Sequence, residues 1–377
     1  MSKPYSYLSE KSYILKRRNL NTNKNLNDKI LLNQYNYYNL INAYKEPFLK
    51  RRTHDGEEHY KDDVEIEHLE ALYIFDTKIR SLFLTNILKI EEEIKHNLIE
   101  SFYLINNPLS DCLEVESEYL HKKYYNLMNL YSKNQFDLNS KKFHIEYSEN
   151  EISRNNLIID RTDIYYNFVS NTYRAISKQK SNRSSNRSVS SYLENHEVVP
   201  LWILANHLTL GNISYFYIIQ KKEVQELFLK KIGFYNKKDI SLTELIFNTS
   251  NILRILTLCR NICAHNERLY NYDVKIPISD NYLSFSKSLP YHEAFEDGSM
   301  DWDKSNKRKG ARGGLYSFIF SIYIFLDSKE KSQFIKEINK NLLELKNKVN
   351  KRDYDFILSI IGLNFDWSNL IKNSKIL

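Results

Sequence analysis

Ile252–Tyr272 reads ILRILTLCRNICAHNERLYNY and carries more chemistry than packing alone requires. At about 100° per residue, its apolar side chains fall within roughly one third of a helical circumference, which is typical of a helix laid on a core. These side chains are Ile252, Ile255, Leu256, Cys259, Ile262 and Cys263. The stretch therefore predicts a buried helix around which the rest of the chain is organised.

Polar side chains occupy the opposite side of the same predicted helix. They are Arg260, Asn261, His265 and Arg268, next to the small Ala264. A guanidinium is a permanent charge suited to phosphate oxygens, and imidazole exchanges a proton near neutral pH. Together they suit phosphodiester chemistry, although a solvated helix face is the commoner explanation for an Arg and a His at this spacing alone.

The fuller string Arg260–Asn271, RNICAHNERLYN, resembles the RN-x2-AH-x2-R-[LW]-x-N signature of the bacterial Abi family of abortive-infection proteins (AbiD/AbiF type), which belong to the HEPN superfamily. Four further blocks resemble family motifs in the family's order, so the resemblance covers nearly the whole chain. They are Asn36–Phe48 (NYY-x5-Y-x2-PF), Phe75–Glu91 (FD-x2-[IL]R…IE), Trp202–Gly211 (W-x5-[LT]-x-[FL]G) and Gly362–Trp367 (G[FL]-x3-W). Asn39 and Lys95 depart from the pattern, since the family often has Arg at both positions.

The resemblance implies a HEPN-like helical bundle and a metal-independent endoribonuclease. In that reaction the ribose 2′-OH attacks the neighbouring phosphate and gives a 2′,3′-cyclic phosphate and a 5′-OH. His265 is then expected to move protons, Arg260 to stabilise charge on the phosphoryl oxygens, and Asn261 to orient His265 or the phosphate. The resemblance further implies a toxin-type role in phage defence, restrained in the AbiF-like branch by a small noncoding RNA.

A single Arg and His pair supplies only one proton carrier, whereas in-line cleavage profits from two. This predicts a homodimer, at least with RNA bound, in which two copies share a site as in other HEPN nucleases. A different class of protein stays open beside the nuclease. In a non-catalytic RNA-binding or protein-docking module, Arg260 and His265 would only grip phosphate, because gripping and cutting phosphate begin with the same residue types.

Composition favours helices. The 377 residues include only 8 Gly and 6 Pro, which disfavours a protein with many tight turns. The 29 Tyr and 19 Phe supply large areas to bury, and the formal net charge of +7 is a modest basic excess consistent with a polyanionic partner. We expect a mainly α protein, a HEPN-like helical bundle with additional N-terminal and C-terminal helical elements.

Three segments are expected along the chain. They are an N-terminal helical extension (1–60), a HEPN-like helical core (61–275) with a polar insertion near 132–191, and a basic loop with a C-terminal helical region (276–377). The three cysteines are too few for a disulfide framework. The N-terminus lacks an apolar core of signal-peptide length, and no window approaches about 18 uncharged apolar residues, so a cytoplasmic location is expected.

Val64–Ile105 carries the longest helical pattern in the sequence, and a break is predicted near Asp76. Its polar side holds Arg80, Glu91, Lys95 and His96. These four are candidates to support the site from a neighbouring helix. The alternative is a structural ion pair between Glu91 and Lys95, which lie one helical turn apart.

Arg268 and two basic stretches are candidate RNA contacts. The serine-rich stretch Ser177–Ser191 carries Lys178, Lys180, Arg183 and Arg187, and is either a phosphate-tracking loop or a flexible linker. The glycine-rich stretch 304–314 carries Lys304, Lys307, Lys309, Arg308 and Arg312. His54 and His59 invite a metal site but lack a third ligand at plausible spacing, so neither a metal nor a cofactor is expected.

Overall fold

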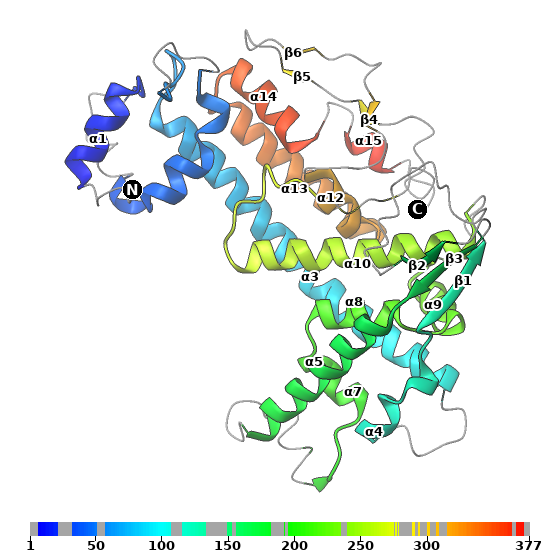
Figure 1. Cartoon of the computed structure of the whole chain (residues 1–377). Helices are drawn as coiled ribbons and strands as arrows, with labels where there is room; N and C mark the ends of the chain where they lie inside the picture. Colours follow the sequence, from blue (N-terminus) through cyan, green and yellow to red (C-terminus); the bar gives the residue numbers. More distant parts are fainter. Residues whose placement is uncertain are drawn as a thin grey trace.

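The computed structural model describes residues 7–21, 32–50, 57–106, 115–132, 149–152, 156–181, 192, 195–234, 240–274, 276, 278, 289–290, 293–294, 300–301, 307–308, 315–363 and 367–372. The helices are α1 (Leu8–Arg17), α3 (Ile66–Asn106), α4 (Glu116–Tyr119), α5 (Thr162–Ser181), α7 (Leu201–Leu204), α8 (Leu210–Ile218), α9 (Lys222–Lys231), α10 (Leu242–Ala264), α12 (Leu315–Tyr323), α13 (Ser328–Lys346), α14 (Lys351–Ile361) and α15 (Trp367–Lys372). Short turns of helix are η1 (Tyr38–Asn42), η2 (Glu46–Phe48), η4 (Lys122–Tyr124) and η6 (Ala205–His207). The predicted mainly α fold is confirmed (Figure 1).

Strands are few and short in the described part of the chain. β1 (Met128–Ser132), β3 (Asn156–Asp160) and β2 (Glu149–Ile152) form an antiparallel sheet in that order. Two further antiparallel pairs join β4 (Leu289–Pro290) to β7 (Lys307–Arg308) and β5 (Glu293–Ala294) to β6 (Met300–Asp301). None of the described helices is both long enough and apolar enough to cross a membrane.

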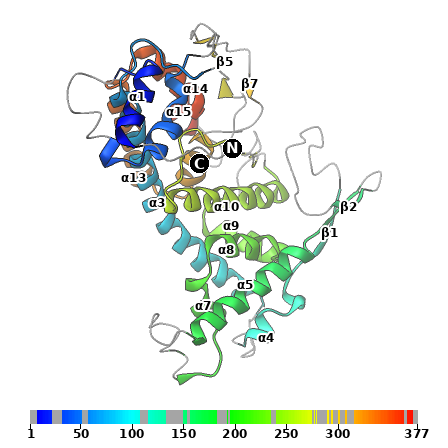
Figure 2. The ribbon, with the colours of Figure 1, turned by 60° about the vertical axis from the view of Figure 1, so that its left-hand side comes forward.

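α3 is the longest element and runs the length of the molecule. It is a continuous helix of 41 residues, about 60 Å at roughly 1.5 Å per residue, so the predicted break near Asp76 was wrong. Asp76 does not cap a new helix, because its carboxylate is buried and binds groups from elsewhere in the chain. The remaining helices gather around the two halves of α3, and α10 crosses it between them (Figures 1 and 2).

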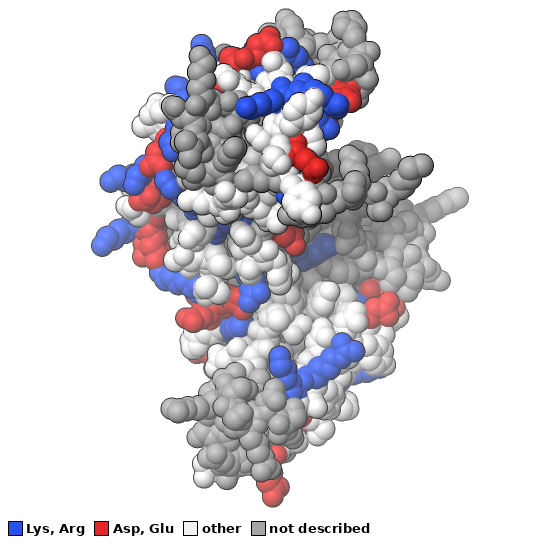
Figure 3. All heavy atoms as spheres, turned by 90° about the vertical axis from the view of Figure 1, so that its left-hand side faces the viewer, with Lys and Arg blue, Asp and Glu red and all other residues white. Residues whose placement is uncertain are grey.

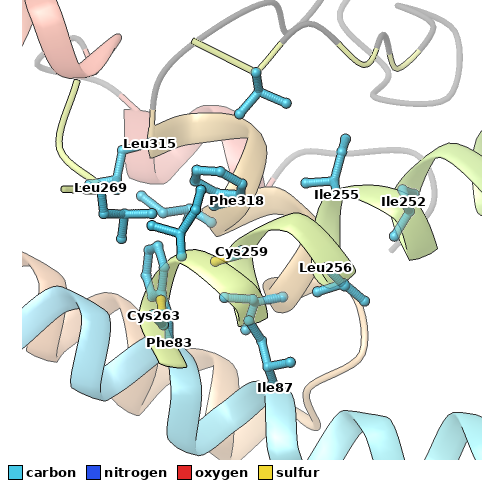
Figure 4. Packing of buried hydrophobic residues seen from close by; sticks show 14 of the residues in the cluster. Phe83, Ile87, Ile252, Ile255, Leu256, Cys259, Cys263, Leu269, Leu315 and Phe318 are labelled. Atoms are coloured by element: carbon cyan, nitrogen blue, oxygen red, sulfur yellow. The ribbon is translucent and has the colours of Figure 1, made fainter. Parts of the chain in front are cut away.

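α10 lies in the middle of the core, between α3 and α12. Its N-terminus is capped by Ser241, whose hydroxyl accepts a hydrogen bond from the backbone N–H of Glu244 at 3.2 Å, as the capping-box spacing indicates. Figure 4 shows the predicted apolar stripe packed against both neighbours, with Cys259 and Cys263 among the side chains of Phe83 and Phe318. All six apolar residues of the stripe are buried, as predicted.

The 132–191 stretch contains more structure than its polarity predicts. Within it lies the helix α5, which packs along α8 and buries Phe168 against Phe216 at 5.1 Å between ring centroids. Tyr165 of α5 also donates its hydroxyl hydrogen to the carbonyl of Leu120 at 2.7 Å. The described part of this stretch is therefore tied to the core by large aromatic side chains and is no simple loop.

Candidate active site at the end of α10

α10 ends in a Schellman turn that presents His265 to solvent. The backbone N–H of Asn266 donates to the carbonyl of Cys263 at 3.4 Å, and that of Glu267 donates to Ile262 at 3.0 Å. Asn266 adopts a left-handed conformation with φ of 57°, which Asn tolerates better than most side chains do. The helix therefore stops before Tyr272, although the polar motif continues in helical register, and His265 lies exposed at its end.

A buried carboxylate of α3 holds the segment that follows this turn. Asp76 is fully buried and accepts backbone N–H groups from Leu269 at 3.2 Å and Tyr270 at 2.7 Å. The Tyr44 hydroxyl donates to the same carboxylate at 2.7 Å. Burial raises the pKa of Asp76, and its hydrogen bond from Tyr44 acts in the opposite direction. Burial and the nearby carboxylate raise the pKa of Tyr44, so its hydroxyl remains a donor.

Arg80 completes this arrangement one helical turn further along α3. Its Nη1 donates to the carbonyl of Glu267 at 2.8 Å, and its Nε lies 3.7 Å from the Asp76 carboxylate. We call Tyr44, Asp76 and Arg80 the α3 clasp. Arg80 was predicted on the polar side of α3, yet it is only 4% exposed, because it binds the turn that carries His265. Its position makes it a support for the turn.

Arg268 and Asn271, the last motif residues, anchor the same segment to the N-terminal part of the chain. The Arg268 guanidinium donates to the carbonyl of Ala43 at 2.5 Å and lies 5.9 Å from the Tyr270 ring. The Asn271 amide donates to the Glu46 carboxylate at 3.2 Å. Arg268 was predicted to contact RNA from the open helix face. It lies beyond the end of the helix, where one N–H of its guanidinium donates to the Ala43 carbonyl.

Arg260 faces α3, where a buried acid lies between two cations. Its Nε is 3.9 Å from Oε2 of Glu91, and the Lys95 ammonium is 2.8 Å from Oε1 of the same carboxylate. The predicted Glu91–Lys95 ion pair is therefore present. Its acid is buried, however, and not on a solvated face as expected. At 3.9 Å, the contact between Arg260 and Glu91 is too long for a hydrogen bond. Because the Arg260 side chain is also 33% exposed, its guanidinium is accessible to a further anion.

The structure brings some candidates together and leaves others apart. Arg260, Asn261 and His265 lie at the C-terminal end of α10, and Glu91 and Lys95 of α3 lie beside Arg260. Asn261 is exposed, and its backbone carbonyl accepts the N–H of His265 at 2.9 Å. His96 points outward with 76% of its side chain exposed, 3.8 Å from Glu100.

The basic stretches lie mostly outside the described residues. Lys178 is exposed on α5, Lys180 belongs to the same helix, and Lys307 and Arg308 form β7. The candidates outside the described residues are Arg183, Arg187, Lys304, Lys309 and Arg312. On the face drawn in Figure 3, the described cationic and acidic side chains are interspersed and form no continuous basic field.

The described residues contain no group of three His, Cys, Asp or Glu side chains placed to hold a metal ion. Cys259 and Cys263 are buried and not disulfide-bonded. Burial raises the pKa of the Cys259 thiol, which keeps it protonated and unreactive. These two cysteines contribute packing and no chemistry to the site.

Sequence reasoning missed the importance of Asp76 and Tyr44. One signal was available, because Asp76 falls on the buried stripe of α3 beside Phe75 and Ile79, where an acid is costly unless it is bound. Its partners lie 32 and 193 to 194 residues away along the chain, and no local pattern identifies them.

These features define a helical protein in which a core helix ends in an Arg-Asn-x2-Ala-His element, with His265 exposed, that is clasped from a second helix. The model of the family described as Abi-like protein matches residues 30–271, and the chain belongs to that family. The match includes the clasp, the Schellman turn and the anchoring contacts of Arg268 and Asn271. Neither a curated protein nor a solved structure matches the chain.

Proposed function

We propose that the chain is a metal-independent HEPN-type endoribonuclease of a phage-defence system. The observation that carries this proposal is the exposed His265 held at a fixed turn, with the accessible Arg260 five residues earlier, near the end of the same helix. Imidazole is suited to transfer the proton of the attacking 2′-OH, and a guanidinium is suited to the charge that develops on phosphate. Membership of the Abi-like family supports the role in defence.

The local charges support phosphate binding at this point. The carbonyl end of a helix carries partial negative charge, which by itself disfavours an anion beside His265. Arg260 and Lys95 flank the single carboxylate of Glu91, so the cluster keeps a net positive charge. In this proposal Arg260 binds the phosphoryl oxygens of the RNA, and Glu91 holds the Arg260 side chain in place.

Two partners belong to the same proposal. A homodimer would supply His265 twice, once as base and once as acid, which in-line cleavage needs and one copy does not provide. A small noncoding RNA would restrain the enzyme until infection. In the alternative, a non-catalytic binder, the same residues would only grip phosphate, and cleavage assays separate the two.

The first experiment incubates purified protein with total RNA, with and without EDTA. Because His265 and Arg260 supply both proton transfer and charge stabilisation, cleavage is expected to survive chelation with little change in rate. The product ends should be 2′,3′-cyclic phosphate and 5′-OH. Loss of cleavage in EDTA that Mg²⁺ restores would contradict the assignment, and binding without cleavage would favour the module that only binds.

The second experiment measures how RNA affinity depends on salt. Replacing the cations of the glycine-rich stretch by Ala should weaken binding and flatten the dependence of log affinity on log salt. The slope should fall by about one unit for each phosphate that the variant no longer binds. The positions are Lys307, Arg308, Lys309 and Arg312.

A matched control removes the same charge from α13 and the turn that follows it. The exposed residues to replace by Ala are Lys329, Lys336, Lys340 and Lys348. This control should leave the slope close to that of the wild type, since it tests net charge alone. Equal slopes in the two variants would show that the glycine-rich stretch makes no specific phosphate contact.

A further inference from the structure

A groove of about 600 Å³ opens between α3 and the α7–η6 segment, next to the site. Ile99 and Ala205 are its buried apolar members. Tyr103 of α3 and Trp202 of α7 supply aromatic rings. Its charged and polar members are Glu92, Lys95, His96, Glu100 and Asn206. An apolar floor with aromatic rings and a few polar groups is the usual composition of a site for a small planar ligand.

The Trp202 ring is exposed and supported from one side. It is 48% exposed, although a large apolar ring gains from burial. Tyr192 meets it edge-on, with centroids 5.9 Å apart at 84°, and Tyr192 itself stacks on His196 at 4.2 Å. This aromatic row holds the indole in place, so a flat partner can stack on it at little conformational cost.

The charges around the groove suit the edge of a nucleobase better than a run of phosphates. Lys95 is paired with Glu91, and Glu100 is paired with Lys231 at 2.7 Å. Burial and the charge of Lys95 lower the pKa of His207, which follows Asn206, so no additional cation forms there near neutral pH. The remaining carboxylate and amide groups offer both acceptors and donors, as base edges require.

The groove is continuous with the site. Lys95 lines it and also shares Glu91 with Arg260 at the end of α10. From Glu91 to Ile99 the rise along α3 is about 12 Å, at roughly 1.5 Å per residue. A single-stranded segment with a phosphate at Arg260 therefore has an adjacent place for an unstacked base.

We propose that this groove binds an unpaired nucleobase of single-stranded RNA, stacked on Trp202 and bound at its edge by Asn206 and Glu92. The inference rests on the proposed function in one respect, that RNA is the ligand. It narrows the expected substrate to RNA in which the bases beside the cleaved phosphate are unpaired.

The test measures binding in a His265→Ala background, so that no cleavage interferes. The probe is a 5′-labelled, unstructured oligoribonucleotide, followed by fluorescence anisotropy. Trp202→Ala should raise the Kd by roughly 5- to 100-fold, as expected for the loss of one stacked base, and Trp202→Phe should stay within a few-fold of the parent. Tyr13→Ala, which removes another exposed aromatic ring on α1, should leave the Kd unchanged.

Two further measurements complete the test. A duplex of the same sequence should bind more weakly and should not respond to Trp202→Ala, whereas Asn206→Ala, an exposed position, should weaken only the single strand. Circular dichroism verifies that each variant is folded. Displacement of the oligoribonucleotide by micromolar adenosine or guanosine monophosphate would overturn the assignment in favour of a free nucleotide.

The outcome separates this inference from the proposed function. If the wild type cleaves RNA but folded Trp202→Ala binds the single strand as its parent does, the groove assignment fails and the nuclease stands. If Trp202→Ala weakens binding but the wild type does not cleave, the groove assignment stands and the nuclease fails.

Discussion

Replacing His265 by Ala is expected to lower the rate of RNA cleavage by about 10²- to 10⁴-fold, the usual contribution of a positioned acid–base group. The fold should be unaffected, because His265 is exposed and only its backbone takes part in the Schellman turn. Release of 2′,3′-cyclic phosphate ends from a short oligoribonucleotide measures the rate. A matched control is His121→Asn. His121 is also exposed, and an amide can replace the imidazole as acceptor for the Lys123 N–H. Full activity of His265→Ala would remove this residue from the reaction.

Mixing two inactive variants extends the same test to the proposed homodimer. Arg260→Ala should also be inactive and folded, because its side chain makes one long ion pair with Glu91 and no hydrogen bond within the described structure. If each site uses Arg260 of one protomer and His265 of the other, equal mixing should restore about one quarter of wild-type activity, since half of the dimers then carry one intact site. No recovery is the result expected if each site uses His265 of both protomers, as proposed above, because a mixed dimer carries only one His265. Cleavage by a strict monomer at high dilution would contradict a shared site.

The core helix shows how far a local pattern reaches. Its apolar stripe follows from spacing alone, because each buried position lies within a few residues of the next, and all six are buried. Its end does not follow from spacing, since the polar motif continues in helical register past His265. The helix stops because Asn266 turns left-handed and the next backbone groups bind Asp76. A stop imposed by a distant side chain is visible only in the folded chain.

The charged residues of α3 also show that sequence spacing predicts contacts within a helix but not contacts with distant segments. Helical spacing predicted the Glu91–Lys95 pair, which is local. It also placed Arg80 and Glu91 on a solvated face, because charged side chains are seldom buried without partners. Their partners, Glu267 and Arg260, come from the end of α10 more than 160 residues away. The groove beside them depends on Trp202 and Asn206 of a third segment, so its shape too is a property of the fold.

The α3 clasp gives the largest effect expected on stability. Asp76→Ala removes the acceptor of two backbone N–H groups and of the Tyr44 hydroxyl, and leaves the buried Arg80 without its carboxylate. Removing one partner of a buried ion pair costs about 3–5 kcal/mol, a large part of the 5–15 kcal/mol typical of a folded protein. The free energy of unfolding in urea measures this loss. Asp62→Ala is the control, because this carboxylate is exposed while it binds Lys50 and Asn19, and the unfolding midpoint should hardly move.

Asp76→Asn tests whether the clasp also positions His265. The amide keeps the shape of the side chain and one acceptor oxygen for Tyr270, but its NH₂ group then faces the donors Tyr44 and Leu269. The turn should loosen without global unfolding at low temperature. We expect kcat to fall by about tenfold or more while KM stays near the wild-type value, because a misplaced acid–base group affects the transition state and not substrate binding. A wild-type kcat in a variant with lowered stability would show that the clasp supports the fold alone, and that the position of His265 depends on the Schellman turn and the anchoring contacts of Arg268.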